Sequence, residues 1–263
     1  MKDEILKQLQ NLSLQEKQDL FFNFVCFGNL TIQINNETFQ TDRIDTIKAL
    51  IELGVDVNAK NKDNATPLFY IDSKEVTEVL IQNGADVNIK NNNGNTLLFF
   101  LESKEMAEML IQHGADVNVR NKYGETPLFN VKSKKIAEFL IQHGADINAR
   151  DHFDATPLFF AKSKEMAALL IQHRADLNAK NKNGDTVLHQ VNNREIVELL
   201  IQVGADVNAR NNEGQTPVEF CRSYGHADLG NFIEQKAIEF EQEKLDQTLL
   251  KPQKSSNHSK YRL

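Results

Sequence analysis

Three histidines, His113, His143 and His173, recur thirty residues apart, and histidine is a side chain that binds zinc and transfers protons near neutral pH. A zinc ion needs its histidine nitrogens within about 2.1 Å, whereas stacked helices lie about 8–10 Å apart. We therefore expect these histidines near helix C-termini, where the helix dipole favours them. The sequence has no glycine-rich phosphate loop, no His-Glu-x-x-His and no nucleophile elbow, so it predicts no enzyme, no cofactor and no metal.

The composition narrows the classes of protein further. The chain has 263 residues and a net charge of −7, and a negative protein repels the phosphates of nucleic acid. Its two cysteines, Cys26 and Cys221, cannot build a disulfide framework, which indicates a reducing compartment. The most apolar stretch, residues 20–27, is too short to cross a bilayer, and the first residues lack a signal-peptide pattern. We therefore expect a cytoplasmic protein that binds neither nucleic acid nor a membrane.

A repeat of thirty residues runs through most of the chain. Threonine, asparagine and glycine mark it at fixed positions, with Arg174 in place of one glycine. The repeated residues are Thr66, Thr96, Thr126, Thr156, Thr186 and Thr216; Asn58, Asn88, Asn118, Asn148, Asn178 and Asn208; and Gly54, Gly84, Gly114, Gly144 and Gly204. A period of about 20–50 residues is typical of solenoids, in which each unit buries its apolar face by stacking on its neighbours.

Each repeat can be interpreted as two short helices. Thr66 is predicted to cap the first helix through its hydroxyl, and Pro67 suits the first helical position, where no N–H is needed. This helix extends little more than one turn, to about Ile71. Ser73 caps a second, amphipathic helix that ends at Gly84 in the left-handed conformation. The polar stretch that follows predicts a connector of turns, in which the repeated asparagines bond their own backbone.

These motifs resemble the ankyrin repeat. The family's Thr-Pro-Leu-His motif corresponds to Thr126-Pro127-Leu128-Phe129, and its Gly-Ala-Asp-Val-Asn motif is present at 84–88, 114–118 and 204–208. The resemblance covers about residues 41–235. It implies an all-α repeat solenoid of stacked helix-turn-helix units with short connector hairpins.

The chain departs from the family pattern in three ways. The usual repeat has about 33 residues, and the three that are missing between the two helices return only in the last unit, as Gly225-His226. The motif histidine survives only as His189, so we expect apolar packing between the other units in place of its hydrogen bond. Arg174 replaces a left-handed glycine at a cost of about 1 kcal/mol, which predicts a locally weaker fifth unit. Phenylalanine replaces the histidine at Phe69, Phe99, Phe129 and Phe159.

The sequence divides into three predicted segments. Residues 1–40 form an N-terminal helical cap with a small hairpin, and residues 236–263 form a C-terminal helix extension and a disordered basic tail. A capping-box pattern at Ser13 and Glu16 begins a phenylalanine-rich helix, which is either part of the cap or a separate partner-binding element. The array between these segments covers residues 41–235, with a degenerate first unit at 41–60 and further units at about 61–90, 91–120, 121–150, 151–180, 181–210 and 211–235.

Residues that vary from unit to unit form the predicted partner-binding surface. In ankyrin-like stacks this surface comprises the connector tips and the exposed side of the first helix. Aromatic side chains with flanking charges are typical of protein interfaces. The tip candidates are Lys122, Tyr123, His152 and Phe153, and the first-helix candidates are Tyr70, Phe100, Phe160, Lys132 and Lys162. Tyr70, Phe100 and Phe160 have an alternative role, because they could turn inward and fill the core volume left by the missing residues.

The resemblance implies a non-enzymatic protein–protein interaction module that presents a preorganised concave face to a protein partner. The chain is rich in Asn, Lys, Ile and Phe, which suggests an AT-rich genome, and such arrays resemble those of host-associated bacteria. We therefore expect a bacterial effector that acts on a host protein, either cytoplasmic or translocated into the host cell, with the basic tail as its export signal. A monomer is expected on this interpretation, and a self-associating structural scaffold is the alternative.

Overall fold

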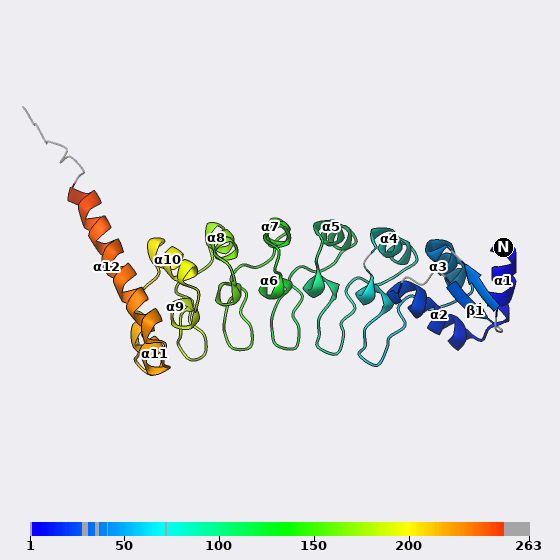
Figure 1. Ribbon diagram of the computed structural model, residues 1–263, viewed down its shortest axis with the longest axis horizontal. Helices are drawn as coiled ribbons and strands as arrows, with labels where there is room; N and C mark the ends of the chain where they lie inside the picture. Colours follow the sequence, from blue (N-terminus) through cyan, green and yellow to red (C-terminus); the bar gives the residue numbers. More distant parts are fainter. Residues whose placement is uncertain (1, 28–30, 35–36, 41, 72, 250–263) are drawn as a thin grey trace, which may run out of the picture. The chain divides into compact units, whose positions relative to one another are not determined.

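The computed structural model describes residues 2–27, 31–34, 37–40, 42–71 and 73–249 (Figure 1). The predicted basic tail, residues 251–263, lies outside the described residues. The chain forms two compact units, of which unit 1 ends at His152 and unit 2 begins at Phe153. This division falls inside the predicted array, because each repeat contacts mainly its immediate neighbours and no single core spans all of them.

Unit 1 begins with two helices and a hairpin and continues with alternating short and longer helices. The hairpin pairs Thr31 with Gln40 in antiparallel register. Figure 1 shows α3, α4, α5 and α7 side by side, with the connector loops on the far side of the short helices. The elements are α1 (Lys2–Asn11), α2 (Leu14–Phe27), β1 (Thr31–Ile34), β2 (Glu37–Gln40), α3 (Arg43–Glu52), η1 (Pro67–Tyr70), α4 (Lys74–Gln82), η2 (Leu97–Phe100), α5 (Lys104–Gln112), α6 (Pro127–Asn130) and α7 (Lys134–Gln142).

Helix α2 closes one end of this stack. The predicted capping box is present, since the Glu16 carboxylate accepts from the Ser13 N–H at 2.8 Å and the Ser13 hydroxyl accepts from the Glu16 N–H at 3.3 Å. Phe21 and Phe24 are buried in one cluster with Leu80 of α4. Their burial favours the cap over a separate partner-binding element, because no apolar ring of this pair is left for a partner.

The repeated short and long helices follow from the sequence pattern. The short helices have four residues, and Ser73 and Ser103 cap the following nine-residue helices by accepting from the N–H three residues on. Ser133 makes no such bond. Gly84 ends α4 with φ of 89°, in the predicted left-handed conformation. His113, one of the histidines that recur every thirty residues, lies at a helix end as predicted. Its Nδ1 is 2.8 Å from the carbonyl oxygen four residues earlier.

The hydroxyl of Thr66 does not cap the short helix that follows it, so that prediction was wrong there, whereas the Thr216 hydroxyl does cap α11 (Pro217–Ser223) by accepting from the Glu219 N–H at 3.3 Å. In four repeats the hydroxyl is buried without a hydrogen-bond partner, at Thr66, Thr96, Thr126 and Thr156. The cause is the phenylalanine three residues further on. Where the motif histidine survives, His189 Nδ1 lies 3.0 Å from the Thr186 hydroxyl and accepts from the Thr186 N–H at 3.0 Å. A phenylalanine ring offers no nitrogen for this contact.

The repeated asparagines connect neighbouring repeats, and the prediction that they bond their own backbone was wrong. Asn58 Nδ2 donates to the Gly84 carbonyl at 2.8 Å, and its Oδ1 accepts from the Asp86 N–H at 2.9 Å. Asn88 and Asn118 make the same pair of bonds to their next repeats. Another asparagine, Asn61, closes its own turn by accepting from the N–H groups two and four residues on.

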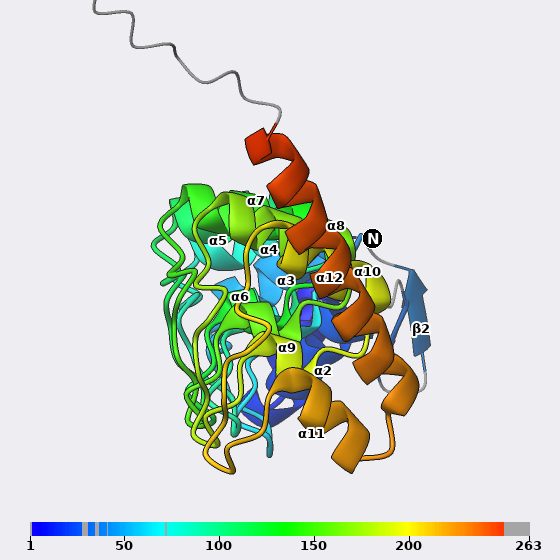
Figure 2. The same ribbon diagram turned by 90° about the vertical axis from the view of Figure 1, so that its left-hand side faces the viewer.

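Unit 2 continues the same pattern and ends in a long helix. Arg174 has φ of 70°, so it adopts the predicted left-handed conformation. With the three extra residues the short helix lengthens to seven in α11. Helix α12 packs against α10 and α11 (Figure 2), with Ile233 fully buried, and it crosses the predicted boundary at residue 236. The elements are η3 (Pro157–Phe160), α8 (Lys164–Gln172), α9 (Val187–Gln190), α10 (Arg194–Gln202), α11 (Pro217–Ser223) and α12 (Ala227–Leu249).

Candidate functional site

The connector loops form a rigid platform in each unit. In unit 1, the N–H of Asn92 donates to the Asp63 carbonyl and that of Lys122 donates to the Asn93 carbonyl, both at 2.9 Å. His152 continues the series in unit 1, and Lys182 and Asn212 repeat it in unit 2. These bonds join equivalent tips of successive repeats, so the backbone that carries the tip side chains is held in place by the neighbouring repeats.

A glycine lets two of these tips approach closely. Gly124 has φ of 80°, and a Cβ at this position would lie 2.9 Å from the His152 backbone nitrogen. No L-amino acid with a side chain fits there without moving the next connector. The left-handed conformation of Gly124 and the close approach of the His152 backbone therefore both restrict the backbone next to Tyr123.

Large aromatic side chains are exposed at the predicted positions. In unit 1, Tyr70 is 42% exposed, Phe100 is 50% exposed and Tyr123 is 49% exposed. In unit 2, Phe153 is 65% exposed and Phe160 is 41% exposed. The alternative that Tyr70, Phe100 and Phe160 fill the core is therefore wrong. The short helix ends at each of these residues and turns into extended backbone, so the rings stay at the surface.

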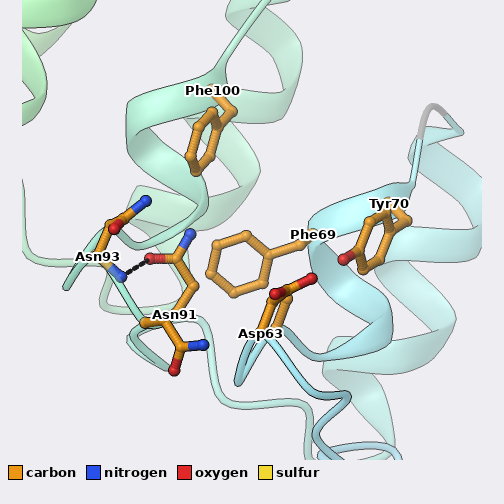
Figure 3. Close-up of a pocket in the computed structure, with 8 residues that line it drawn as sticks. Asp63, Phe69, Tyr70, Asn91, Asn93 and Phe100 are labelled. Carbon is orange, nitrogen blue, oxygen red and sulfur yellow. Dashed lines mark hydrogen bonds between the residues drawn. The ribbon is translucent and has the colours of Figure 1, made fainter.

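Two of these aromatic residues border a hollow in unit 1 (Figure 3). Its volume is about 450 Å³, and Phe69 points into it between Tyr70 and the connector of the next repeat. The Phe69 and Phe100 rings meet edge to face with centroids 6.1 Å apart, as expected if apolar packing replaces the histidine bond. The other lining residues are Asp63, Ala65, Asn91, Asn92 and Asn93.

Phe100 also borders a second hollow, of about 490 Å³, whose lining includes Glu102, Asn130 and Lys132. Lys132 is one of the predicted residues, and it adds a cation to a lining that also contains the Glu102 carboxylate and the Phe99 and Phe100 rings. The two hollows share one exposed ring, so a bound segment could place side chains on both sides of Phe100. Such paired hollows around an aromatic ring suit apolar side chains of a partner.

The charged candidates lie at the surface. The Lys122 ammonium group lies 5.1 Å from the centroid of the Tyr123 ring, a cation–π distance. His152 is exposed in unit 1, and Lys162 is exposed in unit 2. Sequence analysis missed Phe69, Asn91 and Asn93 as lining residues. A signal was present for Asn93, because its connector position varies between repeats, but not for Asn91, whose position is asparagine in five of the six repeats.

The described residues show no arrangement for catalysis with a metal, since no three His, Cys, Asp or Glu side chains among them are placed to share an ion. The buried His189 of unit 2 binds neighbouring backbone, with Nε2 lying 3.1 Å from the Gln215 carbonyl oxygen. Burial lowers the pKa of His189 despite this bond. Within the described part of the chain, no helix combines the length and the apolar character needed to cross a membrane.

Comparisons with known proteins agree with this architecture. A family model described as ankyrin repeats in three copies matches residues 38–121, 72–151, 102–181, 129–211 and 158–244. Among solved structures, the ankyrin repeat domain of Bcl-3, described as a unique member of the IkappaB protein family, is similar with a TM-score of 0.63 and 26% sequence identity. That match covers 80% of this chain and 96% of the other. A search of curated protein sequences finds no match. The predicted all-α repeat solenoid is confirmed, and the small hairpin predicted within residues 1–40 is present as β1 and β2.

Proposed function

The chain belongs to the ankyrin repeat family, and from this premise we propose that it binds a protein partner through the exposed aromatic residues of its connectors and short helices. Ankyrin repeats are in general protein–protein interaction modules, and they are typically non-enzymatic. The observation that carries the proposal is the exposure of Tyr70, Phe100 and Tyr123 in unit 1 and of Phe153 and Phe160 in unit 2.

The physical reason lies in the cost of exposing these rings. Burying apolar surface gains about 25 cal/mol per Å², and large aromatic side chains on rigid backbone are the usual anchors of an interface. Here the rings are held by short helices and by tips that are bonded to one another. A partner therefore meets a preformed surface, and little conformational entropy is lost when it binds.

Affinity purification with mass spectrometry tests the proposal. The bait is the full chain, beside a variant with Tyr70, Phe100 and Tyr123 changed to alanine. A matched control changes Leu14 and Tyr224, each 61% exposed but outside the candidate surface, to alanine. Circular dichroism verifies that each bait is folded. A partner lost from the first variant and kept by the control supports the proposal, and a partner kept by both rejects the unit 1 part of this surface.

We further propose that the partner is a host protein and that the chain acts as a bacterial effector. This step is supported by the Asn-, Lys-, Ile- and Phe-rich composition and by the absence of any catalytic pattern in the sequence. Parallel purifications from eukaryotic and bacterial lysates test it, because an effector should retain a partner only from the eukaryotic lysate. A reporter fused to residues 236–263 that stays inside the bacterium would argue against an export role for that segment.

A self-associating scaffold is the second candidate, and one observation favours it. Ile238 is 54% exposed and Leu245 is 61% exposed on α12, so this helix offers apolar side chains to another molecule. Light scattering over a wide concentration range distinguishes the candidates. A monomer at all concentrations argues against the scaffold, whereas a dimer that Ile238→Glu dissociates would support it.

A further inference from the structure

The connectors of unit 1 carry an excess of positive charge. Residues 58–70, 88–100 and 118–130 contain five cations and two carboxylates, although the whole chain has a net charge of −7. All five cations are exposed, and they repeat at two register positions. We call them the cationic row: Lys60, Lys62, Lys90, Arg120 and Lys122.

Three members of the cationic row, Lys90, Arg120 and Lys122, donate to backbone or amide oxygens and not to carboxylates. Lys90 Nζ donates to the Arg120 carbonyl at 3.0 Å, and the Arg120 guanidinium donates to the Gly124 carbonyl at 2.8 Å. Lys122 Nζ donates to the side-chain oxygen of Asn93. Within the described part of the chain, none of the five forms an ion pair with a carboxylate. Their charges are oriented along the stack and remain available to a partner.

The connectors of unit 2 carry no excess of positive charge. Residues 178–190 and 208–220 contain three cations and three carboxylates. Arg210, the counterpart of Arg120, lies 3.3 Å from the Glu219 carboxylate. The excess of positive charge is therefore specific to unit 1 and is not a general property of these repeats.

The cationic row runs beside the exposed aromatic residues. Asn61, which lies between Lys60 and Lys62 in the chain, donates to the Tyr70 hydroxyl at 2.8 Å. The Lys122 ammonium group lies over the Tyr123 ring. Asp63 is the one connector carboxylate that borders the hollow in Figure 3. Members of the cationic row thus lie next to exposed aromatic residues of unit 1, while the linings of the two hollows contribute one further cation, Lys132.

The distance between equivalent cations of successive repeats favours one backbone conformation for a bound peptide. Stacked helices lie about 8–10 Å apart, so equivalent cations repeat at about 9 Å. A polyproline II helix has about three residues per turn and a rise of about 3.1 Å, so its third residues repeat at about 9.3 Å on one side. In a β-strand, by contrast, residues three apart point to opposite faces. Aromatic-lined grooves also suit the polyproline II surface.

We propose that the cationic row of unit 1 binds an acidic peptide segment in polyproline II conformation, with a carboxylate at every third residue. The proposal rests on the proposed function and names the chemistry of its partner. The carboxylates meet the cationic row, and the apolar residues between them enter the hollows on both sides of Phe100. A single-stranded nucleic acid is disfavoured, because the acidic residues elsewhere on the chain repel a long polyanion.

Fluorescence anisotropy with labelled probes tests the proposal on the full chain. The probe is the peptide (Glu-Pro-Leu)4, and the comparators are (Lys-Pro-Leu)4, a peptide of the same composition with its four glutamates in one block, and a twelve-nucleotide oligothymidylate. We expect (Glu-Pro-Leu)4 to bind at least about tenfold tighter than each comparator, since several exposed ion pairs act together. Added salt should weaken this binding, because the charges are at the surface.

Two triple variants locate the site. Changing Lys60, Lys90 and Lys122 to glutamine should weaken binding of (Glu-Pro-Leu)4 by about tenfold. Changing three exposed lysines of α4 and α7 to glutamine removes the same charge elsewhere in unit 1 and should change binding by less than about twofold. The control lysines are Lys74, Lys134 and Lys135.

The inference would be overturned if any of the three comparators bound as tightly as (Glu-Pro-Leu)4, or if the two triple variants lost equal affinity. Competition separates this inference from the proposed function. A captured protein that requires Phe100 and is displaced by (Glu-Pro-Leu)4 supports both. A captured protein that requires Phe100 but resists (Glu-Pro-Leu)4 supports the proposed function and refutes the acidic polyproline II partner.

Discussion

Replacing Thr126 by valine tests whether its buried hydroxyl lacks a partner. The side chain is 1% exposed, and its backbone is extended with φ of −99° and ψ of 166°. Valine has nearly the same shape and is well suited to extended backbone. A buried hydroxyl without a hydrogen bond costs roughly 1–3 kcal/mol. We therefore expect Thr126→Val to raise the free energy of unfolding by about 1 kcal/mol.

Thr186→Val is the matched control and should change stability in the opposite direction. The Thr186 hydroxyl lies 3.0 Å from His189 Nδ1, so valine removes a hydrogen bond worth about 1 kcal/mol. Urea denaturation followed by circular dichroism measures both variants against the unchanged chain. A loss of stability for Thr126→Val as large as that for Thr186→Val would refute the reasoning, because it would mean that the Thr126 hydroxyl is bonded.

Three further predictions concern single residues and use the same denaturation assay. Arg174→Gly should raise stability by about 1 kcal/mol, since arginine has φ of 70° there, and a decrease would contradict this. Ser103→Ala should lower stability by about 1 kcal/mol, because its hydroxyl caps α5, and Ser133→Ala, which removes no cap, should have a smaller effect. Burial lowers the pKa of His189, so near pH 6.5 and below the unfolded chain takes up a proton more readily than the native one. The free energy of unfolding should fall as the pH drops below about 6.5, and His189→Phe should remove this part of the slope; unchanged slopes between about pH 7 and pH 5 would exclude His189 as the source.

The repeat could be predicted from sequence because its signals are local. Gly84, Ser73 and the capping box at Ser13 act within a few residues of themselves, so the helix ends follow from the chain alone. The wrong predictions for the threonine hydroxyls and the repeated asparagines concern hydrogen-bond partners that depend on residues at other positions. The Thr126 hydroxyl depends on the residue three positions on, and the Asn58 amide bonds a carbonyl in the next repeat. Periodicity marks such positions but does not identify their partners.

The candidate surface could be predicted only in part, for a related reason. A phenylalanine at the end of a one-turn helix can face the core or the solvent, and the sequence left both outcomes open for Phe100. The structure places it half exposed between two hollows. The hollows themselves depend on the connector of the following repeat, through Asn91 and Asn93, so they appear only when two repeats are stacked. The binding role of this surface stays a proposal.

The last repeat shows why the shortened units expose their aromatic rings. Phe220 occupies the same register as Phe100, but α11 continues for another turn, and the Phe220 ring packs against Tyr224 with centroids 4.6 Å apart. In the shorter units the helix stops at this register, as η2 does at Phe100, and no following turn covers the ring. The loss of three residues therefore removes the helical turn that would lie over the ring. The change from histidine to phenylalanine places the apolar Phe69 ring against Phe100. Two departures from the family pattern thus have a single structural consequence, an aromatic surface that the additional turn of a full-length repeat would partly cover.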